Sequence, residues 1–320
     1  MISIRKLAPI ALAIGMSFAG VAHADPIVNF NLKDGNNNLL TTGGTGLDWA
    51  SSGSGVAKAV GGFNPNVALQ QGYEFDFLYQ AALKGSVGGL QNMNGLDAEA
   101  NGVGDAGKGY EFTIVSKMRE VVLSSSVSTG GPGPNTSTAV FGLAGTPAQN
   151  RVAIYYDTAM NANTALGTGF DDGQLIALFT IDAGDDAFPT FSSFTSMAPN
   201  AGNGSARIRA SLSQPGDFVD SNFLEGITSL IFGINFQSNL NYPAGDSATA
   251  GFHLSSEPNS AGLFPGYAVN LAGGDLLLQV DGNSQFTSRV PEPASIMLIG
   301  AGLMGALGAT RRRSNKAKQA

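Results

Sequence analysis

The chain contains no cysteine among its 320 residues, and only one tryptophan and two histidines. The absence of cysteine excludes disulfide bonds, a thiol nucleophile and any zinc site built on cysteine. Charged residues make up only 13% of the chain, and the formal net charge is −7. Nucleic acid is therefore not expected as a partner, because binding to phosphate depends on a basic patch.

The first 24 residues have the order of parts found in a secretory signal peptide. Arg5 and Lys6 form a positive start, and residues 7–21 form an apolar stretch without charge. Ala22 and Ala24 supply the small residues of a cleavage site. We therefore expect export, with the mature chain beginning just after Ala24.

The C-terminal region has three consecutive parts. A stiff Pro-Glu-Pro segment comes first, because proline fixes its own φ and restricts the residue before it. Residues 294–310 follow without a charge and predict a short transmembrane helix of about 25 Å, slightly less than the bilayer core. A basic cluster then indicates the cytoplasmic side, which places the main domain outside the inner membrane and residues 314–320 in a cytoplasmic tail. The residues concerned are Pro291, Glu292, Pro293, Arg311, Arg312 and Arg313.

This order of parts over residues 290–313 resembles the PEP-CTERM sorting signal of Gram-negative bacteria. The resemblance implies recognition of Pro291, Glu292 and Pro293 by a membrane-embedded exosortase, with removal of the tail during sorting. The arginine cluster would act as the stop, and the inner membrane would hold the protein only transiently. Proteins of this kind accompany exopolysaccharide production and the formation of biofilms or flocs. A plain tail anchor with a proline-rich stem is the alternative.

Three segments of the mature chain resemble flocculation-associated PEP-CTERM proteins. They are Leu47–Ala57, Phe77–Ala81 and Leu277–Gly282. The resemblance carries over no functional residue, so it implies an association with flocculation but does not identify a binding or catalytic site.

Between the two ends, residues 25–289 are expected to form one exported domain of all-β class, a β-sandwich or jelly-roll-like fold. Apolar and polar residues alternate over 73–83, and also over 28–32, 110–115 and 206–212. Four further runs are apolar on both faces: 152–156, 175–181, 230–236 and 276–280. Turn-forming residues separate them at 34–38, 88–109, 129–135 and 198–204. A boundary between two domains around 130–135 is the alternative.

The sequence contains few candidate catalytic residues, which favours a protein that is not an enzyme. His253 is the one histidine left after signal cleavage, and no G-x-S-x-G sequence occurs. Residues 102–109 satisfy two phosphate-binding patterns, but a predicted strand follows them where those patterns need a helix. We interpret this segment as a loop.

Carboxylates offer the remaining chemistry. The aspartates concerned are Asp171, Asp172, Asp182, Asp185 and Asp186. Two carboxylates across a cleft could hydrolyse glycosides, but neighbours on a strand point to opposite faces. The same loops could bind calcium, which takes six to eight oxygen ligands. No other cofactor is expected.

Three classes of function therefore stand open. The first is a structural or adhesive protein, sorted by exosortase, that promotes flocs or biofilm with exopolysaccharide or a neighbouring cell surface as partner. The second is a carbohydrate-binding module, with or without calcium, that uses Trp49 or the strand tyrosines. The third is a secreted hydrolase acting through carboxylates.

Overall fold

The computed structural model describes residues 27–60, 69–128, 136–182, 191–198, 201–237 and 275–287. The signal-peptide prediction, including Ala22 and Ala24, lies outside these ranges. So do the predictions for residues 290–320, for Asp185 and Asp186, and for His253.

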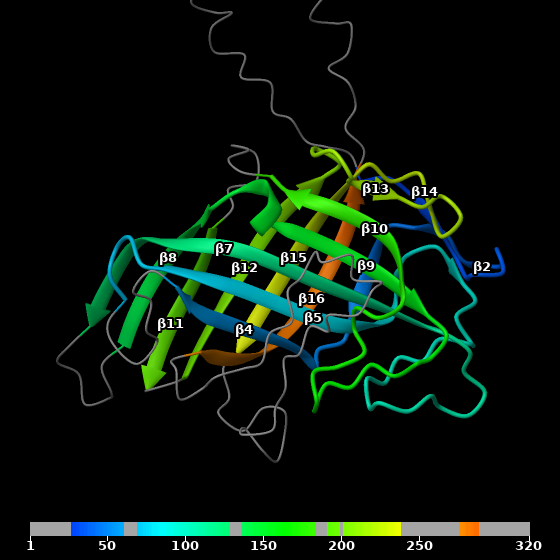
Figure 1. Cartoon of the computed structure of the whole chain (residues 1–320), viewed down its shortest axis with the longest axis horizontal. Coiled ribbons are helices and arrows are strands. Elements are labelled where there is room, and N and C mark those ends of the chain that lie inside the picture. Colours follow the sequence, from blue (N-terminus) through cyan, green and yellow to red (C-terminus); the bar gives the residue numbers. More distant parts are fainter. Residues whose placement is uncertain are drawn as a thin grey trace, which may run out of the picture.

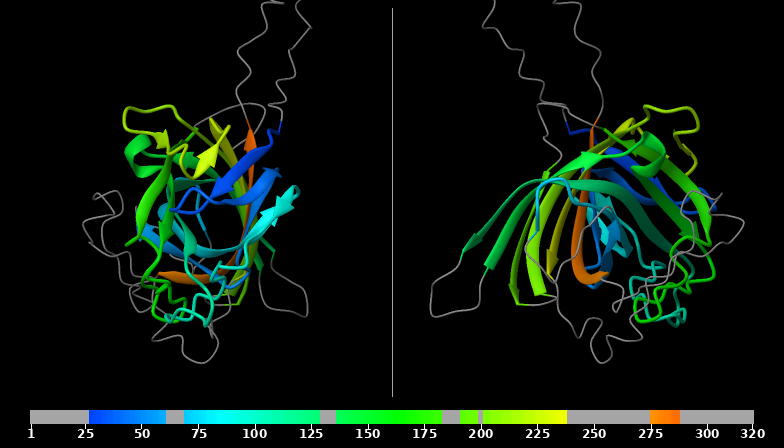
Figure 2. Two further views of the ribbon diagram at one scale, coloured as in Figure 1. Left: turned by 90° about the vertical axis from the view of Figure 1, so that its right-hand side faces the viewer. Right: turned by 60° about the vertical axis from the view of Figure 1, so that its left-hand side comes forward.

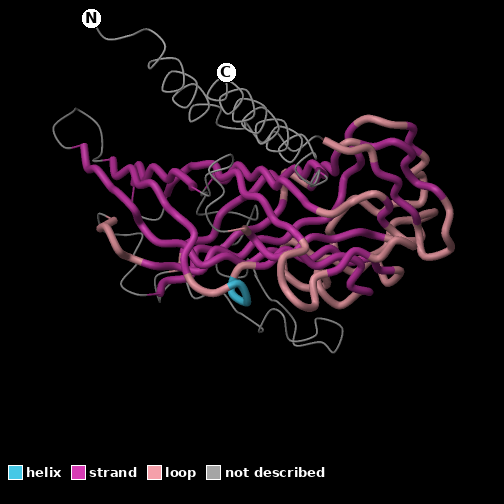
Figure 3. The backbone as a smooth tube through the Cα atoms, turned by 90° about the horizontal axis from the view of Figure 1, so that it is seen from above, coloured by secondary structure: helices cyan, strands magenta, loops and turns pink. Residues whose placement is uncertain are grey.

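The described residues are almost entirely strands, which confirms the all-β class (Figure 1). Within them, the helical content is one turn of 3₁₀-helix, η2 (Pro147–Gln149), and no helix is long and apolar enough to cross a membrane (Figure 3). The strands are β1 (Phe30–Lys33), β2 (Leu39–Gly44), β3 (Gly46–Trp49), β4 (Gly53–Val60), β5 (Glu74–Val87), β6 (Leu90–Gln91), β7 (Glu111–Ser128), β8 (Thr136–Ala144), β9 (Arg151–Asp157), β10 (Gln174–Ile181), β11 (Phe191–Ala198), β12 (Ala201–Ser211), β13 (Phe218–Val219), β14 (Leu224–Glu225), β15 (Ser229–Gln237) and β16 (Leu276–Thr287).

Twelve of these strands form one antiparallel sheet that returns to its own start. From β5 the pairing runs through β7, β8, β11, β12, β15 and β16 to β4, which pairs with β5 again. At the other end of β7, the strands β9 and β10 take the place of β8 and β11 and lead to β12. The strands therefore curve around a common interior (Figure 2).

The main hydrophobic core fills that interior. Alternate residues of β5 point into it, namely Phe75, Phe77, Tyr79, Ala81 and Leu83, and each is less than 5% exposed. This confirms the inward aromatic face expected from the alternation over residues 73–83. The small sheet of β14, β1, β2 and β6 adds Phe30, Leu32, Leu40 and Leu224 to the same core.

The alternation predicts a mostly polar opposite face of β5, and this face is buried from Asp76 to Ala82. Leu78 lies in a second apolar cluster on the outside of the sheet, with Val115 and Tyr155. Phe170 and Ala162, from the connection between β9 and β10, pack over this cluster. The sequence pattern could not reveal this, because the covering segment is distant along the chain.

The turn predicted at 198–204 is wrong in extent, because β11 continues to Ala198 and β12 begins at Ala201. The glycine and asparagine content of this segment predicts a loop. The start of β12 is nevertheless a strand, because it pairs with β11 on one edge and with β15 on the other. The strands on either side of residues 129–135 pair with each other, from Arg119 opposite Ala144 to Ser128 opposite Thr136. They therefore belong to one sheet.

Candidate functional site

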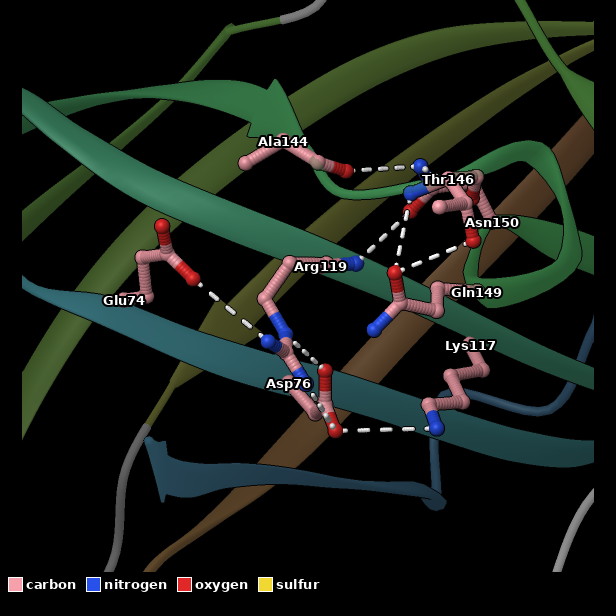
Figure 4. A network of polar contacts seen from close by, with 8 residues as sticks. All are labelled: Glu74, Asp76, Lys117, Arg119, Ala144, Thr146, Gln149 and Asn150. Carbon is pink, nitrogen blue, oxygen red and sulfur yellow. Dashed lines mark hydrogen bonds and ion pairs between the residues drawn. The ribbon is translucent and has the colours of Figure 1, made fainter. Parts of the chain in front are cut away.

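A network of charges on the outer face joins β5 to β7 (Figure 4). The guanidinium of Arg119 donates to Asp76 from Nε at 2.5 Å and from Nη2 at 3.2 Å. Its Nη1 reaches Glu74 at 3.4 Å, and the ammonium of Lys117 lies 3.6 Å from the second oxygen of Asp76. The ion pair with Asp76 raises the pKa of Arg119. Each carboxylate is matched by a cation, so this network offers no free base.

The backbone around Arg119 is held by the connection from β8 to β9. The amide N–H of Arg119 donates to the side-chain oxygen of Asn150 at 2.7 Å. The amide nitrogen of Asn150 in turn donates to the carbonyls of Ala144 and Thr146. Gln149 completes the turn by accepting from Thr146 (Figure 4). These contacts fix the point at which β7 exchanges β9 for β8 as its neighbour.

A row of polar residues continues around the sheet from this network. Each member lies directly opposite the next on the neighbouring strand: Lys117, Arg151, Thr180, Ser211, Ser229 and Thr287. Asp217 accepts from Arg151 at 2.7 Å and from Thr180 at 3.2 Å. Ser229 and Thr287 share a hydrogen bond of 2.7 Å between their hydroxyls. These contacts lie within the protein and join neighbouring strands of the sheet.

Polar side chains also fasten the segment that covers the second apolar cluster, residues 158–173. The carboxylate of Glu111 is 1% exposed and accepts from the backbone N–H groups of Asn161 (2.9 Å) and Ala162 (3.2 Å). Thr113 donates to the carbonyl of Phe170, and Gln80 to that of Gly167. Burial raises the pKa of Glu111 to about 8. The two backbone hydrogen bonds lower this pKa, whereas the negative charges of Asp157 and Asp97 raise it further.

The structure does not gather the aspartates proposed for calcium or glycoside chemistry. Asp171 and Asp172 precede β10, whereas Asp182 follows it, so they lie at opposite ends of an eight-residue strand. The carboxylate of Asp182 accepts from Ser211 at 2.6 Å and faces the guanidinium of Arg209 at 3.5 Å. Among the described residues, no group of three or more His, Cys, Asp or Glu could hold a metal ion. The three described aspartates therefore do not fit one calcium site.

Most of the aromatic residues proposed for carbohydrate binding are buried, and Tyr73 is partly buried against the core. Trp49 is 1% exposed, and its indole N–H donates to Ser284 at 3.0 Å. Tyr79 and Tyr155 are fully buried, and Tyr110 and Tyr156 stack inside the core. A ring must be exposed to stack on a sugar, so the prediction of a sugar platform at these residues is wrong.

The end of β16 lies close to the predicted sorting segment. β16 pairs with β15 on one edge, and with β4 and β3 on the other. Ile27 continues that second edge by bridging Thr287, and Val28 donates from its backbone N–H to Phe286 at 3.1 Å. Pro291 follows only four residues after Thr287. The predicted sorting segment therefore follows closely on a strand that is paired with neighbouring strands along both of its edges.

Comparisons with known proteins bear on this segment. Residues 289–313 match the family described as the PEP-CTERM protein-sorting motif. No curated protein and no solved structure matches the chain. The motif is processed by exosortase, and it marks a secreted protein that its C-terminal tail holds at the membrane before surface display. The chain thus carries a PEP-CTERM protein-sorting motif in residues 289–313.

Proposed function

We propose that this protein acts without catalysis, as a structural or adhesive component that promotes flocs or biofilm together with exopolysaccharide. The observation that carries the proposal is the sorting motif, which begins two residues after β16 ends. A motif so placed delivers the folded β-domain itself to the surface. The likeness of residues 47–57, 77–81 and 277–282 to flocculation-associated proteins supports the same setting.

The polar networks of the domain also favour a structural role. Arg119, Asp76 and Lys117 satisfy one another, and Asp217 is shared between Arg151 and Thr180. General acid–base chemistry needs a group within reach of a substrate proton, and these groups are already committed to the protein. The covering segment likewise uses the carboxylate of Glu111 for its own attachment.

The charge of the domain suggests how it would meet an acidic polysaccharide. Residues 25–290 contain 10 Lys and Arg against 23 Asp and Glu, a net charge of −13. Such a surface repels an anionic polymer directly, and divalent cations between the two would remove the repulsion. We therefore propose that aggregation depends on divalent cations in the medium, shared between many surface carboxylates.

Gene deletion with complementation tests this function. A strain without the gene should settle less in a flocculation assay, while its exopolysaccharide output stays unchanged. The full chain should restore settling. A variant with Pro291, Glu292 and Pro293 replaced by alanine should not, and mass spectrometry should find its tail uncleaved.

A variant with a weakened domain and an intact sorting motif distinguishes the effect of sorting to the surface from the effect of the folded domain on settling. Asp76→Asn weakens the domain but leaves the motif intact, so it should be cleaved normally and restore settling in proportion to its abundance. Unchanged settling after deletion, with polysaccharide intact, would refute the proposed function.

A further inference from the structure

The two ends of the described chain meet at one point of the fold. Ile27 and Thr287 form an antiparallel bridge, and Thr287 lies opposite Ser229, which lies opposite Ser211. Neighbouring strands are about 4.8 Å apart, so these four residues span roughly 14 Å. In Figure 1, the end of β16 and β13 lie at the same end of the fold, away from the end of β7 that pairs with β8.

The chain that leaves this point reaches the membrane after a short distance. Seven residue steps separate Thr287 from Ala294, where the apolar part of the tail begins. A fully extended chain covers at most about 3.6 Å per residue, which gives about 25 Å. While the tail is in the bilayer, this end of the domain therefore stays within that distance of the lipid headgroups.

Exposed apolar side chains occur at the same end. Ile27 is 50% exposed, Leu212 39% and Phe218 37%. Leu212 follows Ser211 directly, and Phe218 lies beyond the tight turn that Asp217 closes by accepting from the backbone N–H groups of Ser213 and Gln214. We call the surface formed by Ile27, Leu212 and Phe218, together with those of residues 213–222 that are exposed, the exit face.

The carboxylates on and beside the exit face have partners within the protein, and two of them pair with cations. The side chain of Asp217 is fully buried and pairs with Arg151. Asp220 accepts from the backbone and the side chain of Asn222. Glu225, in the adjoining β14, pairs with Lys33 and Asn31. Unpaired carboxylates would be repelled by anionic lipid, and here Asp217 and Glu225 are each paired with a cation.

We propose that the exit face rests on the phospholipid surface of the inner membrane while the tail is still in the bilayer. Apolar side chains at a membrane surface enter the boundary between headgroups and acyl chains, and the ion pairs of Asp217 and Glu225 lower the electrostatic penalty of approaching anionic lipid. The proposal rests on the transient anchoring, and not on the flocculation role. If the exit face rests on the membrane, this end of the domain is the one that faces the membrane-embedded exosortase.

The absence of cysteine makes the test direct, because a single introduced cysteine can be labelled alone. Ser221→Cys places a fluorophore on the exit face, and Ser126→Cys places one on β7 at the far side of the sheet; both serines are exposed. The full uncleaved chain is purified from cells without exosortase. It is reconstituted in vesicles of phosphatidylethanolamine and phosphatidylglycerol that carry a headgroup quencher.

We expect quenching at position 221 to exceed quenching at position 126 several-fold. In the 221 background, Leu212→Ser with Phe218→Ser should reduce quenching, whereas the matched change Leu123→Ser on β7 should not. Circular dichroism and the melting temperature confirm folding in each case. Equal quenching at both positions would overturn the proposal, as would energy transfer between copies without lipid quenching.

Alkaline extraction of the same vesicles distinguishes a failure of the exit-face proposal from a failure of the membrane anchoring on which it depends. A chain that resists extraction but shows equal quenching contradicts the exit face alone. A chain that is extracted contradicts the anchoring on which the exit face depends. Neither result concerns flocculation, which is measured in cells.

Discussion

Arg119 and Asp76 form a two-point ion pair, from Nε at 2.5 Å and Nη2 at 3.2 Å, that joins β7 to β5. Their side chains are 16% and 8% exposed, so the pair is largely shielded from water. Glu74 contacts the same guanidinium from 3.4 Å and is 40% exposed. One cation is thus shared by a buried and an exposed carboxylate.

Asp76→Asn should lower the free energy of unfolding by about 2–3 kcal/mol, because it leaves Arg119 and Lys117 without their buried partner. Glu74→Gln is the matched control and should cost less than about 1 kcal/mol, because exposed ion pairs contribute little. Urea unfolding of both variants measures the difference. Equal losses of unfolding free energy in the two variants would contradict the larger contribution expected from the buried Asp76.

Trp49→Phe should destabilise the domain by about 1.5–3 kcal/mol, since it shrinks a fully buried side chain and leaves Ser284 without its donor. Ser284→Ala removes the same hydrogen bond with little change in volume and should cost less. Thermal unfolding ranks the two variants. A Trp49 variant of unchanged stability that loses binding to an oligosaccharide would show instead that this residue is a binding residue.

The sequence predicted the strands well where their own pattern decides burial. The alternation around Phe75 and Phe77 is a local property, and it placed the inward face correctly. The outward face could not be predicted in the same way, because Leu78 is covered by residues about 90 positions later in the chain. The turn predicted at 198–204 failed for the same reason, since long-range pairing outweighed local composition.

The candidate site shows a similar division. Pro291, Glu292 and Pro293 are adjacent in the chain, so the sorting motif is readable without a structure. The network around Arg119 is not, because its residues come from three separate segments: β5, β7 and the connection from β8 to β9. Regular charges at positions 74, 76, 117 and 119 were the available signal, but only the register of β5 and β7 shows that they meet.

Asp182→Asn should destabilise the domain to the same extent in calcium and in a chelator. The reason is that Asp182 accepts from Ser211 and faces Arg209, so its loss affects a protein contact and not a metal ligand. Removing one side of such a pair should cost about 1–3 kcal/mol. Melting curves in both buffers test this, with Asp172→Asn as the control at the other end of β10. A destabilisation seen only with calcium would restore the metal hypothesis.

Glu111 should make the domain less stable as the pH rises. Burial raises its pKa from the ordinary value of 4.5 to about 8 in the folded state, so the folded state binds the extra proton between those values. Its contribution is therefore complete below about pH 4.5 and is lost as the pH passes through about 8. Relative to Glu111→Gln, which keeps the acceptor oxygen, the native chain should lose about 2–4 kcal/mol across this window. Urea unfolding at several pH values measures the two curves, and parallel curves would show that residues 158–173 are attached independently of this proton.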